Sequence, residues 1–195
     1  MVTTIKNTEA DSAARLFQAK RFALWIGIAG MMMVFTSLTS AYIVRKAAGN
    51  WLEFKLPDIF FYNALLAMAS SVVLQASYAA FKRGKFALYK SLLALTLLMG
   101  VAFLVGQYAG WMQLTDMGIF LQGNPSGSFV FVLSGLHALH LLVGLTSLSV
   151  ALFQALSLPD RLTERRKFRF GLTLTFWHFL TFLWVYLMAL WMYLA

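Results

Sequence analysis

Three histidines are the residues of this chain best able to bind a metal ion or to carry a proton. His137 and His140 lie three positions apart in one apolar stretch, and His178 lies in another. Side chains three apart in a helix are neighbours, so the first two histidines are expected to lie on one helical face. Imidazole nitrogens bind iron, copper and zinc, and histidines also form proton relays in membranes. The sequence therefore raises two hypotheses, a metal site and a proton path.

The residues around the histidines argue against both hypotheses. A haem held between two helices needs an axial ligand from each helix, and copper and zinc sites usually add thiolates or carboxylates. The chain has three histidines and no cysteine, and no Asp or Glu lies in the middle of an apolar stretch. Proton relays in membranes usually include such acids. We therefore predict that the chain binds no metal, holds no catalytic residue, and uses its histidines as neutral hydrogen-bonding groups.

The other polar side chains in the apolar stretches suit contacts between helices. Hydroxyls and amides there are more often interhelical hydrogen-bond partners than a conduction path. Glycines let helix backbones approach closely, and Gly106, Gly110, Gly135 and Gly144 lie in two of these stretches, the first pair as a GxxxG pattern. The pattern predicts a tightly packed bundle. The polar residues concerned are Thr36, Ser37, Thr39, Ser40, Gln75 and Gln107.

Five apolar stretches have to position these residues. Hydrophobic residues make up 61% of the 195-residue chain and charged residues 12%, against roughly 45–50% and about 25% in soluble domains. A helix needs about 20 apolar residues to cross roughly 30 Å of hydrocarbon, where only helices and closed barrels satisfy their own backbone. The sequence predicts an all-α, polytopic transmembrane bundle. It comprises an N-terminal segment 1–21 and a five-helix domain 22–195, with spans at approximately 22–44, 58–80, 88–111, 128–156 and 171–194.

The basic residues indicate how the bundle is oriented. Four Lys or Arg precede the first span, four lie in or beside the loop between the second and third, and five lie between the fourth and fifth, whereas the opposite side has three. Cytoplasmic loops carry the excess of Lys and Arg. We therefore predict a cytoplasmic N-terminus and a periplasmic C-terminus. The same clustering makes the net charge of +9 a topology signal, so no nucleic-acid partner is expected.

Two segments resemble the signatures of a known family. Gly135-Leu136-His137-Ala138-Leu139-His140, followed by Gly144, resembles the "GxHGxHVxxG" pattern of the haem–copper oxidase subunit III family, which includes cytochrome c oxidase subunit 3 and its quinol-oxidase relatives. Trp177-His178-Phe179, followed by Trp184, resembles that family's "YWHFxDxxW". Further resemblances are a glutamine-aromatic run with its loop, at Gln107, Tyr108, Trp111, Asp116 and Gly118, and the first retained helix, at 21–42. The resemblance favours the short, five-helix bacterial form of the family.

Three positions depart from the family pattern. Met31 stands where many relatives have a membrane glutamate, Thr181 replaces an aspartate, and Gly171 stands in place of a second glutamate. Roles of those carboxylates in lipid binding or proton handling are therefore not transferred. The resemblance implies structural, lipid-contact or partner-contact roles for Gln107, Trp111, Gly135, His137, His140, Trp177, His178 and Trp184.

The resemblance implies a non-catalytic accessory subunit of an aerobic respiratory terminal oxidase in a bacterial inner membrane. Such a subunit packs mainly against subunit I and also meets subunit II, with a larger respiratory supercomplex as a further candidate partner. It would stabilise the catalytic subunit, hold structural phospholipids in a cleft between helix groups and support proton uptake, while the haems and copper belong to the partner subunits. The alternatives are the equivalent subunit of a nitric oxide reductase or quinol oxidase, and a free-standing small transporter.

Overall fold

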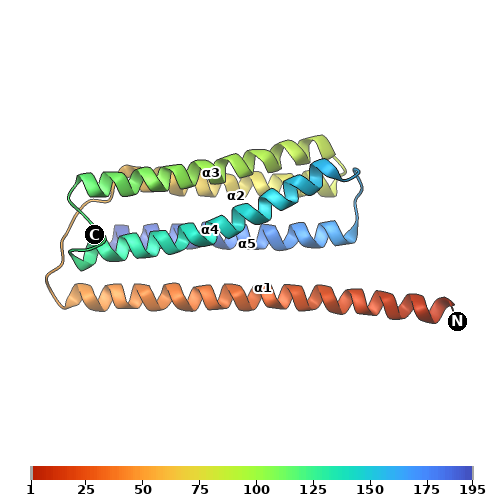
Figure 1. Cartoon of the computed structure of the whole chain (residues 1–195), viewed down its shortest axis with the longest axis horizontal. Helices are drawn as coiled ribbons and strands as arrows, with labels where there is room; N and C mark the ends of the chain where they lie inside the picture. The colour runs from red at the N-terminus through yellow and green to blue at the C-terminus, as the bar shows by residue number, and fades with distance from the viewer. Residues whose placement is uncertain (1, 195) are drawn as a thin grey trace.

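The computed structural model describes the backbone of residues 2–194 and the side chains of residues 15–194. It contains five helices and, within the described residues, no strand. All five are long and apolar enough to cross a membrane, which confirms the predicted all-α transmembrane fold. In chain order they are α1 (Val2–Ala47), α2 (Asp58–Lys82), α3 (Phe86–Asp116), α4 (Pro125–Ser157) and α5 (Glu164–Leu194), as drawn in Figure 1.

The helices extend beyond the spans predicted from hydropathy. α3 ends at Asp116 rather than near 111, and α5 begins at Glu164 rather than near 171. α1 continues back to Val2, so the described part of the N-terminal segment 1–21 is helical. Hydropathy marks the part of a helix that suits hydrocarbon, whereas backbone hydrogen bonding continues until a residue ends it. The helices are therefore longer than the predicted spans, and which part of each helix lies in the membrane stays a prediction.

Helices α2, α3, α4 and α5 form a four-helix core, and α1 lies alongside it (Figure 1). α2 packs against α3 and α5, α4 lies against α3 and α5, and α1 contacts α4 and α5. In Figure 1 α4 runs obliquely to α5, as expected of a 33-residue helix that has to tilt. The interior is aromatic, and its fully buried side chains include Trp184, Trp191, Phe60 and Phe81 from the core and Phe35 from α1. Most of the α1 surface stays exposed.

Two glycines of α3 allow it to lie close to α2. A Cβ atom at Gly110 would lie 2.7 Å from the Phe60 ring, and one at Gly106 would overlap the Asn63 side chain. Both contacts are closer than real Cβ atoms show, so a larger residue at either position would require the Phe60 or Asn63 side chain, or α2 itself, to shift. The GxxxG pattern therefore marks the contact between α2 and α3, and the predicted tight packing is confirmed there.

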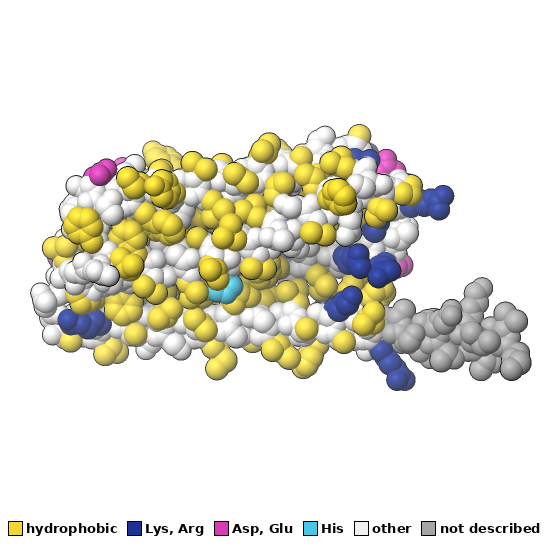
Figure 2. All heavy atoms as spheres, in the orientation of Figure 1, with side chains coloured by type: hydrophobic (Ala, Val, Ile, Leu, Met, Phe, Trp, Pro, Cys, Tyr) yellow, Lys and Arg dark blue, Asp and Glu magenta, His cyan; other side chains and the backbone are white. Residues whose placement is uncertain are grey.

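Basic side chains gather at one end of the bundle. Figure 2 shows most of the Lys and Arg side chains of this face at the end where α4 leads into α5, with hydrophobic side chains along the rest. The α2–α3 and α4–α5 loops meet at that end, where Lys90 Nζ lies 2.8 Å from Asp160 Oδ1. The charge asymmetry predicted from the sequence is present in the fold. Its relation to the two sides of a membrane stays a prediction.

Candidate functional site

His137 and Trp184 lie at the centre of the four-helix core. His137 of α4 is 1% exposed, and its ring centroid lies 5.0 Å from that of Trp184 of α5 and 5.8 Å from that of Phe103 of α3. Trp184 also packs against Phe60 of α2 and Trp191, with ring centroids 6.1 Å apart in each pair. Aromatic pairs in such geometries contribute about 0.5–1.5 kcal/mol beyond burial. The α4 and α5 signatures thus meet in one aromatic cluster that joins all four core helices.

Gln107 of α3 faces the same centre and is buried. Phe103, one turn before it, packs on His137, and Trp111, one turn after it, donates a hydrogen bond to Ser134 of α4. Because α3 and α4 run antiparallel, these two contacts set Gln107 beside the α4 segment from Ser134 to His137. Several buried polar atoms of this centre have no hydrogen-bond partner among the described residues. They are Gln107 Oε1 and Nε2, His137 Nδ1, Trp184 Nε1 and Trp191 Nε1.

Trp177 joins α5 to the other three core helices. Its Nε1 donates a hydrogen bond of 3.0 Å to Ser70 Oγ of α2. Its ring occupies space left by two glycines, since a Cβ atom at Gly100 of α3 would lie 2.8 Å from the ring and one at Gly144 of α4 would lie 3.3 Å from it. Trp177 is therefore a packing residue whose single polar atom is satisfied.

Trp111 and Gly135 lie together at the α3–α4 contact. Trp111 Nε1 donates a 2.9 Å hydrogen bond to Ser134 Oγ, which in turn donates to the Val130 carbonyl at 2.6 Å. A Cβ atom at Gly135 would lie 3.9 Å from the Trp111 ring, an ordinary van der Waals distance. The close backbone approach expected at Gly135 is therefore not found, because an indole ring rather than a helix backbone lies opposite it.

His140 faces α1 rather than the core. Its Nδ1–H donates to the Leu136 carbonyl of its own helix at 2.8 Å, and its ring meets Phe35 of α1 edge-on, with centroids 6.0 Å apart. His137 lies three residues earlier and points into the aromatic cluster. The two histidines therefore have different neighbours, although they lie about one turn apart on α4.

His178 faces α2 and is half-buried. Its Nδ1 is hydrogen-bonded to Ser71 Oγ, and its Nε2 lies 3.2 Å from Gln75 Oε1. With Ser71 as the donor to Nδ1, the neutral imidazole donates its Nε2–H to the amide oxygen of Gln75. The three histidines thus occupy three separate surroundings. Within the part of the chain that the structure describes, no three His, Cys, Asp or Glu side chains come together as a metal site would require.

Sequence reasoning missed a row of buried polar residues on α2. Asn63, Ser70 and Ser77 are 4%, 2% and 0% exposed. Asn63 Nδ2 donates to the Phe103 carbonyl of α3 at 3.3 Å, and Ser77 Oγ donates to the Tyr89 carbonyl of α3 at 3.0 Å. The three residues recur every seven positions, which is close to two helical turns and sets them on one face. That spacing was the available signal.

A cleft opens between α1, α4 and α5 near the basic end of the bundle. Its volume is about 800 Å³, and its walls are mainly apolar side chains of α4 and α5, with Leu24 from α1. Arg166 and Arg169 line it at one end, and Phe176 lines it deeper along α5. Arg166 and Phe176 are ten positions apart, which is about 15 Å along a helix. The cleft thus combines a cationic mouth with an apolar interior.

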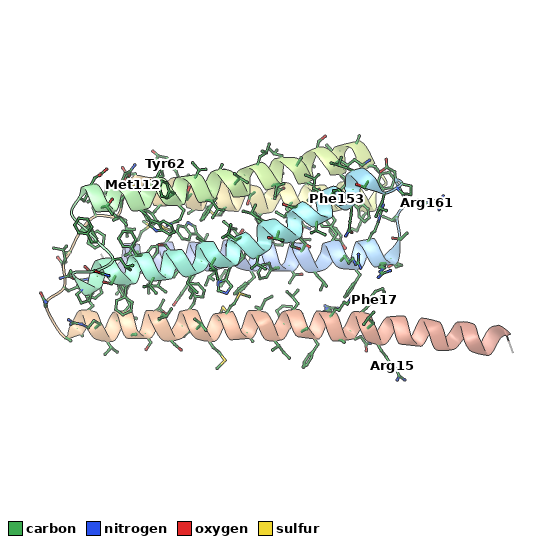
Figure 3. The ribbon with its side chains drawn as sticks, in the orientation of Figure 1. Arg15, Phe17, Tyr62, Met112, Phe153 and Arg161 are labelled. Carbon is green, nitrogen blue, oxygen red and sulfur yellow. The ribbon has the colours of Figure 1, made fainter. Side chains whose placement is uncertain are left out.

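A second, smaller cavity lies on the other side of the α1–α5 contact. It has a volume of about 420 Å³ and is lined by residues that include Arg21 and Trp25 of α1 and Lys167 and Gly171 of α5. Phe17 of α1 stacks on Phe168 of α5 at its edge, with ring centroids 4.6 Å apart. Figure 3 shows Phe17 pointing from α1 toward the core and Arg15 pointing away from it.

Comparison with known proteins decides the family. The profile of the family described as cytochrome c oxidase subunit III matches residues 52–195, the larger part of the chain, with helices α2 to α5 and all eight predicted site residues. The chain belongs to the cytochrome c oxidase subunit III family. It is a non-catalytic, multi-pass membrane subunit of a haem–copper oxidase and associates with other oxidase subunits, to which the haems and copper belong.

Curated relatives agree with this membership. Cytochrome c oxidase subunit 3 of Corynebacterium diphtheriae is 28% identical over 161 residues, which cover 78% of this chain and 77% of that protein. Cytochrome c oxidase subunit 3 of Synechocystis is 27% identical over 173 residues, covering 85% and 71%. Heme-copper oxidase subunit I+III of Aeropyrum pernix is 28% identical over 146 residues, covering 68% of this chain and 18% of that protein.

Proposed function

We propose that the chain serves a respiratory cytochrome c oxidase of a bacterial inner membrane, where it stabilises the catalytic subunit, holds phospholipids and supports proton uptake. The observation that carries the lipid role is the cleft between α1, α4 and α5 with Arg166 and Arg169 at its mouth. The names of the relatives favour a cytochrome c oxidase over the quinol oxidase and nitric oxide reductase alternatives. Family membership favours a subunit over a free-standing transporter.

The cleft suits one phospholipid of the leaflet at the basic end. Its volume of about 800 Å³ lies within the roughly 300–1,000 Å³ of ligand pockets. From Arg166 to Phe176 it spans about 15 Å, half of a hydrocarbon core of roughly 30 Å. Guanidinium groups bind phosphate oxygens in pairs of parallel hydrogen bonds. We therefore place the phosphate headgroup of the lipid at Arg166 and Arg169 and its acyl chains beside Val143 and Phe176.

Native mass spectrometry of the purified oxidase tests the lipid role. Arg166→Gln with Arg169→Gln removes both headgroup contacts, so we expect fewer copies of this subunit to carry bound phospholipid after mild delipidation. Arg165→Gln is the matched control, because Arg165 is exposed on the same turns of α5 and does not line the cleft. Equal lipid occupancy in the double variant and the wild type would contradict the role, and so would an equal loss in the control.

The proposed main partner is oxidase subunit I, with subunit II as a second contact. Aeropyrum pernix has a relative named for subunits I and III together, which supports a position of this chain beside subunit I. Removal of the chain is then expected to shorten the time over which the remaining oxidase keeps turning over, more than it lowers the initial rate. Oxygen consumption followed over many turnovers, with and without the subunit, measures both quantities. An unchanged time course after removal would rule out the supporting role.

A further inference from the structure

The centre of the four-helix core contains a small cavity with a polar wall. The cavity has a volume of about 10 Å³ and lies between α2, α3, α4 and α5. Most of its lining is apolar, with contributions from Phe103, Leu141 and Leu180. His137 and two hydroxyl residues, Ser70 and Thr181, also line it. It is separate from the lipid cleft, which shares none of these lining residues.

The polar groups around this cavity keep unused hydrogen-bonding capacity. His137 is 1% exposed and its Nδ1 has no partner among the described residues. Ser70 Oγ donates to the Ala67 carbonyl at 2.7 Å and accepts from Trp177 Nε1 at 3.0 Å, which leaves it one acceptor position. Thr181 Oγ1 lies 3.5 Å from the same Ala67 carbonyl, a long contact that leaves its hydroxyl available.

We propose that this cavity binds one structural water molecule, held by His137, Ser70 and Thr181. The cavity volume of about 10 Å³ lies at the lower limit of the roughly 10–15 Å³ that one water molecule needs. The three hydrogen bonds of the water itself also balance. The water donates one proton to the unprotonated imidazole nitrogen of His137 and one to Ser70 Oγ, and it accepts the Thr181 hydroxyl proton. Three partners is the usual number for a buried water in a protein.

The proposed water would satisfy the hydrogen-bonding capacity of the buried His137 imidazole nitrogen. A neutral imidazole with an unpartnered nitrogen loses roughly 1–3 kcal/mol in a protein interior. Leucine would avoid that loss in an apolar core, whereas a bridged imidazole links α4 to Ser70 of α2 and Thr181 of α5. We expect the bridge to fix the rotation of these three helices about their axes.

An electron cryo-microscopy map of the oxidase complex, at a resolution that shows ordered waters, tests the proposal directly. We expect a separate density peak within hydrogen-bonding distance of His137 and Thr181 in the wild-type protein. The variant Thr181→Val keeps the side-chain shape and removes the hydroxyl, so the peak is expected to disappear or weaken. A wild-type map without the peak would overturn the proposal.

Nitrogen-15 NMR of the histidine imidazoles, compared between the wild type and Thr181→Val, supplies an independent measurement. We expect Thr181→Val to shift the His137 signals. Thr175→Val is the matched control, because Thr175 lies on the same helix, donates to the Gly171 carbonyl at 3.0 Å and does not line the cavity. His137 signals that stay unchanged in Thr181→Val, or that move equally in Thr175→Val, would contradict the bridge. If Thr181→Val does not assemble, the wild-type map decides.

Discussion

Trp177 and Trp184 lie two helical turns apart on α5, yet their indole nitrogens meet different surroundings. Trp177 Nε1 has an acceptor in Ser70 Oγ at 3.0 Å, whereas Trp184 Nε1 has no partner among the described residues. Trp184 instead contributes ring contacts to His137 and Phe103. One tryptophan therefore acts through packing and a hydrogen bond, and the other through packing alone.

This difference predicts unequal costs for replacing the two tryptophans by phenylalanine. Trp177→Phe removes a satisfied donor and leaves Ser70 with one partner fewer, whereas Trp184→Phe removes a buried N–H that has no acceptor among the described residues. Both lose similar volume, so we expect Trp177→Phe to be the more destabilising by about 1 kcal/mol. Unfolding of the purified subunit in detergent, followed with denaturant, measures the difference. An equal or larger loss in Trp184→Phe would contradict this reading of the two sites.

The candidate site could be predicted from the sequence only in part. The signature pattern identified His137, His140 and His178, because residue type and spacing are visible in the chain. Their surroundings were not visible, since the rotation of each helix about its axis decides whether a side chain meets the core, α1 or α2. The spacing placed His137 and His140 on one helical face, but it did not show that His137 meets the aromatic cluster and His140 meets α1.

At the scale of elements, α2 and α3 form the tightest pair and α1 the loosest attachment. Gly110 lets α3 approach Phe60 of α2, whereas a Cβ atom at Gly27 of α1 would meet nothing within 4 Å. Apolar length was enough to predict all five helices, because each must satisfy its own backbone in hydrocarbon. Which helices pair closely depended on small residues at particular positions, and only the GxxxG pattern of α3 indicated one such pair.

The two glycines predict opposite results for the same substitution. Gly110→Ala places a methyl group 2.7 Å from the Phe60 ring, so the buried ring or the two helices must shift, at an expected cost of about 1–3 kcal/mol. Gly27→Ala meets open space and replaces a poor helix former by a good one, so we expect no loss and a gain of up to about 1 kcal/mol. The stability of each variant in detergent checks both. A neutral Gly110→Ala would show that the two helices are less constrained than their contact indicates.

At the scale of the whole molecule, the two ends of the bundle differ in their content of basic residues. Lys and Arg concentrate where the α2–α3 and α4–α5 loops meet, and the α3–α4 loop at the other end has none (Figure 2). The lipid cleft opens beside the basic end, with Arg166 and Arg169 among its lining residues. If that end is cytoplasmic, the proposed phospholipid belongs to the inner leaflet. Basic residues attract the anionic headgroups of that leaflet.

Cysteine labelling tests the orientation on which this reading rests. The chain has no cysteine, so a single introduced one gives the only thiol signal from the subunit. Lys85→Cys lies in the α2–α3 loop and Gln122→Cys in the α3–α4 loop, and both positions are exposed. In spheroplasts treated with a membrane-impermeant maleimide, we expect Gln122→Cys to react at once and Lys85→Cys to react only after permeabilisation. Lys20→Cys should follow Lys85→Cys, because the N-terminal segment is predicted to share its side. The reverse pattern would invert the topology and move the proposed lipid to the outer leaflet.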